Sequence, residues 1–167
     1  MRLYKRIFLI SMVLLSILLD TSVLPFTGIN MLYTPKVALL TIVVIALLLG
    51  RTQGILYGAV AGVLMDITVA IPTGLVSIVY TVSGLISGYI GRKSRYRMLS
   101  SVIAPVLSML IYEITLMVYY FSSAGAVTGS MFLMALVRTV IGTVIVQLMY
   151  LGFNLVLKPK HSRYLRR

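Results

Sequence analysis

The chain has few acidic residues and lacks cysteine. Only three Asp and Glu occur among its 167 residues, against fifteen Lys and Arg. The absence of cysteine excludes disulfide bonds, thiolate metal sites and dithiol redox chemistry. Histidine occurs once, at His161 in the basic tail, where it is interpreted as a solvated residue. Charged residues make up only 11% of the chain, whereas a soluble globular domain has about 25%.

Long apolar runs take the place of the missing charges, since 60% of the residues are hydrophobic. Asp20, Asp66 and Glu113 lie inside or at the end of such runs, and nearly all the basic residues flank them. The surface between the charged clusters must therefore face lipid, so we predict an integral membrane protein with a single membrane domain over residues 1–167. The positive charge is typical of loops beside membrane spans and of contact with anionic lipid, and does not favour nucleic acid.

Six apolar runs predict transmembrane helices, because a span needs about 20 largely apolar residues. The predicted spans cover residues 7–24, 35–49, 54–70, 74–91, 99–121 and 130–157. The second run is short for a span unless the bilayer thins around it. The fold class predicted is an all-α polytopic membrane protein with six transmembrane helices.

The basic residues lie in alternate connections, which indicates the topology. The N-terminus, the connection at Arg51, the segment after the fourth run and the tail hold thirteen of the fifteen. Under the positive-inside rule both termini are cytoplasmic. The segment after the fourth run contains Arg92, Lys93, Arg95 and Arg97. It is interpreted as a lipid-facing stop-transfer loop in preference to a site for a cytoplasmic partner. Lys36, just inside the second run, is expected to extend toward the outer surface.

Two runs carry small residues at helical spacing. The third has Gly54, Gly58 and Gly62 at intervals of four, and Asp66 extends the same stripe by one turn. A matching stripe in the fourth run consists of Ser77, Gly84, Gly88 and Gly91. Such stripes let helix backbones approach closely. Packing within this chain, as a hairpin of the two runs, is favoured over a seam between molecules.

The intramembrane charges predict one ion pair. Glu113 and Arg138 each lie eight residues from the outer end of their helix, about 12 Å deep. A lone charge at that depth is costly, so we predict that the two side chains pair. Asp66 and Asp20 would lie shallower, near the outer headgroups, with Asp20 exposed to water. Two hypotheses remain for this charge cluster: it fixes helix register, or it binds a partner helix or small solute.

Enzymatic signatures are missing from the sequence. It has no Gly-rich phosphate loop, no HExxH motif and no paired-carboxylate or Cys/His nucleophile arrangement. The prediction is a protein that is not an enzyme and uses no metal or cofactor.

The Gly58-x-x-x-Gly62-x-x-x-Asp66 stripe, followed by Pro72-x-Gly74 and a second Gly-rich helix, resembles the MreD family of rod shape-determining proteins. The resemblance implies a non-enzymatic scaffold of the bacterial inner membrane that maintains rod shape within the elongasome during peptidoglycan synthesis. It also implies partners: an MreC-like single-span protein, an MreB-like filament, and RodA with its transpeptidase. The fold it implies is like that of the S-components of energy-coupling factor transporters.

Three hypotheses for function are compatible with the sequence. In the first, a groove in the outer half, with Asp66 at its mouth, receives the membrane helix of the MreC-like partner. In the second, the chain is a solute-binding S-component of a vitamin transporter. Its first helix lacks an Ala-x-x-x-Ala surface for a coupling subunit, and its outer loops have few polar groups for a vitamin. The third, a proton-coupled transporter or channel, is the least favoured.

Overall fold

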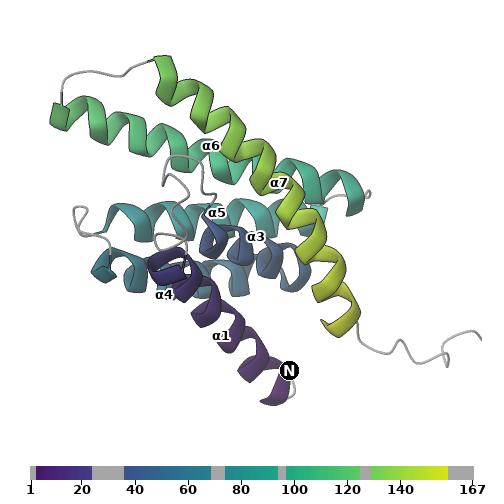
Figure 1. The fold of residues 1–167 in the computed structure, drawn as a ribbon. Coiled ribbons are helices and arrows are strands. Elements are labelled where there is room, and N and C mark those ends of the chain that lie inside the picture. Colours follow the sequence, from purple (N-terminus) through teal and green to yellow (C-terminus); the bar gives the residue numbers. More distant parts are fainter. Residues whose placement is uncertain (1–2, 24–35, 69–73, 94–96, 125–128, 158–167) are drawn as a thin grey trace, which may run out of the picture.

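The computed structural model describes residues 3–23, 36–68, 74–93, 97–124 and 129–157, and nearly all of them are helical. The elements in chain order are α1 (Leu3–Leu18), the π-helical turn η1 (Leu19–Val23), α3 (Val37–Leu49), α4 (Arg51–Thr68), α5 (Leu75–Lys93), α6 (Arg97–Ala124) and α7 (Gly129–Leu157). All six apolar runs therefore form α-helices, with ends within a few residues of those predicted (Figure 1). The all-α prediction is confirmed for the described residues.

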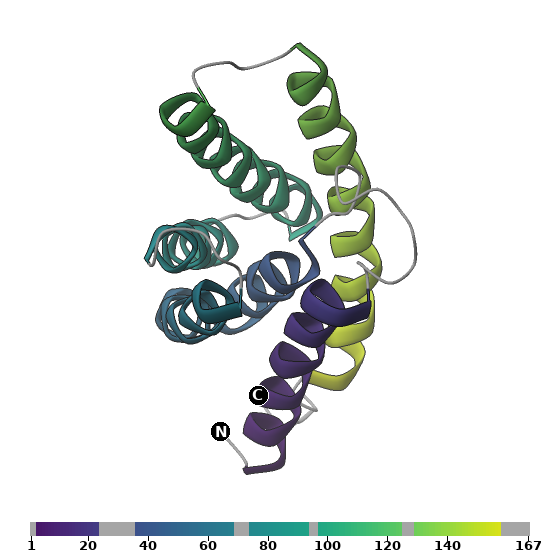
Figure 2. The same cartoon turned by 60° about the vertical axis from the view of Figure 1, so that its left-hand side comes forward.

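The short second run forms the centre of the molecule. Helix α3 contacts α1, α4, α5, α6 and α7, and every residue from Ala38 to Ala46 is buried. Its apolar residues are spread over its whole circumference, as expected for a helix surrounded by protein. With 13 residues it is about 20 Å long, shorter than the roughly 30 Å hydrocarbon core. The other helices enclose it (Figure 2).

A single glycine joins α3 to α4. Gly50 has φ 93°, a left-handed conformation that favours glycine, and its N–H donates to the carbonyl of Ala46 at 2.8 Å. The N–H of Gly54 already returns to the Gly50 carbonyl at 3.1 Å. The connection expected around Arg51 is therefore a one-residue break, and Arg51 is the first residue of α4.

Helices α4 and α5 lie side by side, and α6 and α7 form a second pair (Figures 1 and 2). Helix α6 and helix α7 are the longest, with 28 and 29 residues. They cross at an angle and separate toward Ala124 and Gly129 (Figure 2). Buried Pro105 lies inside α6, where it removes one backbone donor.

Large apolar side chains cover much of the outer surface of the described helices. They include Leu14 and Leu18 on α1, Ile67 on α4 and Leu148 on α7, each about half exposed or more. An apolar surface of this extent is typical of contact with lipid.

Three of the described helices are long and apolar enough to cross a membrane. The stretches concerned are Leu75–Arg92, Leu99–Tyr119 and Met131–Phe153, and α3 is a shorter apolar helix. The other predicted spans and the cytoplasmic position of the termini stay predictions.

Candidate functional site

Asp66 holds the start of the next helix. It lies in the last turns of α4 and is only 7% exposed. Its Oδ2 accepts hydrogen bonds from the N–H groups of Gly74 at 3.1 Å and Ser77 at 3.0 Å, and from the Ser77 hydroxyl. Its Oδ1 accepts from the N–H of Val76 at 3.1 Å. The first N–H groups of a helix have no partner within it, so the carboxylate both pairs them and complements the helix dipole of α5.

This arrangement corrects the expected place of Asp66 at the mouth of an open groove. The carboxylate is buried and surrounded by donors from its own chain. Gly74, with φ 109°, supplies the left-handed residue directly before α5. The motif Asp66 … Pro72-x-Gly74 is thus a helix-capping device, although Pro72 itself lies outside the described residues.

Asp20 caps the start of α3, as Asp66 caps the start of α5. Its carboxylate accepts from the N–H of Val37 at 2.9 Å through Oδ1 and from the N–H of Ala38 at 2.9 Å through Oδ2. The π-helical turn η1 carries Asp20, which is 7% exposed. The expectation that Asp20 is exposed to water is therefore wrong. The reason is that two amides at the start of α3, far along the chain, need an acceptor inside the bundle.

Glu113 and Arg138 form the predicted ion pair. Oε1 of Glu113 on α6 lies 3.1 Å from Nη1 of Arg138 on α7, and the side chains are 6% and 13% exposed. The pair joins the two long helices α6 and α7. Each charge offsets the cost of burying the other.

Lys36 lies beside Asp20 in the chain's fold. It is half-buried and directly precedes Val37, whose N–H donates to Oδ1 of Asp20. Sequence analysis placed Lys36 only as a side chain extending toward the surface. Its place just inside the second run was the available signal, because every basic residue except Lys36 and Arg138 lies outside the apolar runs.

The glycine stripes face each other across α4 and α5. A Cβ atom at Gly58 would lie 2.6 Å from the carbonyl oxygen of Tyr80, and one at Gly62 would lie 2.5 Å from the Cα of Ser77. Gly54 and Gly84 approach so closely that neither has room for a Cβ atom beside the other's backbone. The two stripes are in close contact within this chain.

The far end of the same interface reaches the junction of α3 and α4. A Cβ atom at Gly88 would lie 2.5 Å from the Cα of Arg51, and one at Gly91 would lie 2.8 Å from the carbonyl oxygen of Leu47. Because both stripes are filled by the chain's own backbone, they are closed to a partner helix in this structure.

The basic segment after α5 is only partly within the described residues. Arg92 is exposed, the side chains of Lys93 and Arg97 are not described, and Arg95 lies outside the described residues. The interpretation of this segment as a lipid-facing loop stays a prediction.

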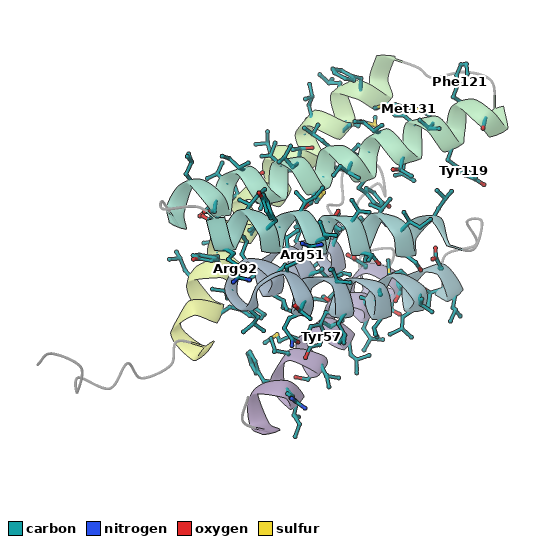
Figure 3. All side chains as sticks on the ribbon, turned by 180° about the vertical axis from the view of Figure 1, so that it is seen from behind. Arg51, Tyr57, Arg92, Tyr119, Phe121 and Met131 are labelled. Carbon is teal, nitrogen blue, oxygen red and sulfur yellow. The ribbon has the colours of Figure 1, made fainter. Side chains whose placement is uncertain are left out.

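An apolar groove lies between α5 and α6. It is lined by Leu75, Val76, Val79, Tyr112, Thr115, Leu116 and Tyr119. Figure 3 shows Tyr119 extending from α6 toward the end of α5. Its lining includes no glycine and neither Glu113 nor Arg138. Sequence analysis did not find it because its residues come from two helices.

Comparison with protein families identifies the chain. The model of the rod shape-determining protein MreD matches residues 1–159 of the 167. This chain belongs to the MreD family. No curated protein and no solved structure matches it.

Membership of the MreD family gives the chain a role in rod shape determination as a membrane protein that works with other shape-determining proteins. The resemblance seen in the sequence is therefore confirmed over almost the whole chain. The likeness to the S-component fold stays a prediction, since no solved structure matches.

This MreD chain also buries hydroxyl groups that sequence analysis did not single out. The hydroxyls of Ser87 on α5 and Ser108 on α6 lie 3.2 Å apart, and Ser101 donates to Oε1 of Gln147 on α7 at 3.2 Å. The hydroxyl of Tyr80 has no hydrogen-bond partner among the described residues. Serine is common enough in helices that its pattern alone gives no signal of these contacts between helices.

Proposed function

We propose that this protein is a non-enzymatic scaffold of the bacterial cytoplasmic membrane that maintains rod shape by binding an MreC-like single-span partner. The main support for this proposal is that the chain belongs to the MreD family. In it the chain crosses the membrane six times with both termini in the cytoplasm, and the basic segments face an MreB-like filament. RodA and its transpeptidase belong to the same machinery for peptidoglycan synthesis.

The use of the acidic groups supports a scaffold over an enzyme. All three Asp and Glu of the chain accept hydrogen bonds or pair with a cation of the same chain. A general base needs a carboxylate that reaches a substrate, and here the carboxylates reach helix ends and an arginine.

The partner's membrane helix would then contact a helix face that is not already covered by this chain. The glycine stripes are filled, so we propose that binding uses the apolar outer faces of the helices in place of the Asp66 groove first expected. Membrane helices associate through van der Waals packing between such complementary surfaces. No contact among the described residues favours the vitamin-transport hypothesis.

Copurification of the full chain with an MreC-like protein tests the proposal. A stable complex is expected in mild detergent. Photo-crosslinking residues at Leu116 in the α5–α6 groove, Val60 on α4 and Leu148 on α7 would identify the contacting face. Absence of a complex, together with equal crosslinking to the partner and to an unrelated single-span protein, would overturn the proposal.

A further inference from the structure

Two exposed arginines are brought together at one end of the bundle. Arg51 begins α4 and Arg92 lies in the last turn of α5, and both side chains are exposed. The close approach of Gly88 to the Cα of Arg51 sets their separation, because Arg92 follows Gly88 by one helical turn, about 6 Å. Figure 3 shows Arg51 and Arg92 at the same end of the α4–α5 pair.

These arginines have no acidic side chain to pair with. The chain's three acids are Asp20, Asp66 and Glu113, each held by other groups. Asp66 is the acid on α4, and 15 residues separate it from Arg51, which is about 22 Å along the helix. That distance exceeds the Debye length of about 8 Å at physiological salt. The counter-ion of the two arginines must therefore come from outside the protein.

Arg92 lies at the end of an apolar stretch that is long enough to cross a membrane. The apolar stretch of α5 suited to cross a membrane runs from Leu75 to Arg92, so Arg92 is at its last position. Its 18 residues extend about 27 Å, close to the thickness of the hydrocarbon core. At the end of such a span the nearest anions are lipid phosphates, which arginine binds through paired N–H donors.

We propose that Arg51 and Arg92 form a binding site for the headgroup of an anionic phospholipid. The close glycine contact between α4 and α5 fixes the spacing of the two backbones from which these side chains extend, so both guanidinium groups can reach one phosphate. The site is independent of the proposed scaffold function.

Lipid competition on the full chain tests this site. The purified protein is equilibrated in micelles with equal amounts of phosphatidylglycerol and phosphatidylcholine, and native mass spectrometry counts each lipid retained. A basic side chain near an anionic surface contributes about fivefold in affinity. The two arginines together are therefore expected to increase the ratio of phosphatidylglycerol to phosphatidylcholine retained by roughly 30-fold. The variant R51Q/R92Q should lose the contribution of the two arginines to this ratio and keep the helical circular dichroism spectrum of the wild type.

The matched control is R166Q/R167Q, which removes the same charge from the tail and should keep the preference. If the double variant does not fold, R51Q and R92Q separately should each lose about fivefold. An unchanged preference in the folded variants, or an equal loss in the tail control, would overturn the site. Displacement of the lipid by inorganic phosphate would assign the site to free anions, and absence of any preference in the wild type would leave a protein partner as the counter-ion; either result contradicts the proposal.

Discussion

Replacing Asp66 with alanine tests whether this carboxylate holds α5 in place. The change removes the acceptor of three backbone N–H groups, and that of Val76 is buried. An unpaired buried donor costs about 1–3 kcal/mol and a lost helix cap about 1 kcal/mol, so we expect a loss of about 3 kcal/mol in the free energy of unfolding. Asp66→Asn keeps one acceptor oxygen without the charge, and should lose about half as much because charge-assisted hydrogen bonds are about twice as strong as neutral ones.

The measurement is reversible unfolding of the full chain in mixed micelles, followed by far-ultraviolet circular dichroism. Thr68→Val is the matched control in the same helix end, because the Thr68 hydroxyl donates only to carbonyls of its own helix, those of Leu64 and Met65. It should change stability by no more than about 0.5 kcal/mol. If Asp66→Ala is no more destabilising than this control, the capping role assigned to Asp66 is refuted.

The other variants follow from the remaining buried contacts, and the same unfolding assay measures them. Arg138→Leu should cost about 3 kcal/mol because it leaves Glu113 buried without its partner, whereas adding Glu113→Leu should recover most of that loss; a double variant no better than the single one would contradict the pair. Gly58→Ala should cost about 1–3 kcal/mol because its Cβ meets the α5 backbone, and Gly152→Ala, with open space around it, should be neutral or stabilising; equal effects would exclude a tight interface. Asp20→Ala should destabilise the protein less than Asp66→Ala, since it leaves two backbone N–H groups without their acceptor in place of three. The reverse order would show that the number of freed N–H groups does not determine the loss of stability.

The helices could be predicted from the sequence because each apolar run is bounded by basic residues, prolines or glycines. The central position of α3 could not. Its shortness indicated an unusual helix, yet only the packing of five other helices around it shows why it has no polar face. The turn at Gly50 could likewise not be predicted, since a single glycine between two apolar runs does not specify the angle between the helices that they form.

The charges show where sequence reasoning succeeds and where it stops. The pairing of Glu113 with Arg138 followed from equal depth on neighbouring helices, because opposite charges in an apolar medium need each other. The role of Asp20 did not follow, since its hydrogen-bond donors are 17 and 18 residues away and a π-helical turn orients it. For Asp66 a signal was present: the glycine and serine that it binds come soon after Pro72 in the same stretch of sequence.

The central claim is that the buried acids and the glycine stripes hold this chain together, and that its partner binds elsewhere. The most direct test is to measure, for Asp66→Ala and Gly58→Ala, both the folded fraction and the amount of MreC-like partner bound per folded molecule. The claim predicts a lower folded fraction with unchanged binding per folded molecule. A variant that stays fully folded but no longer binds the partner would contradict it.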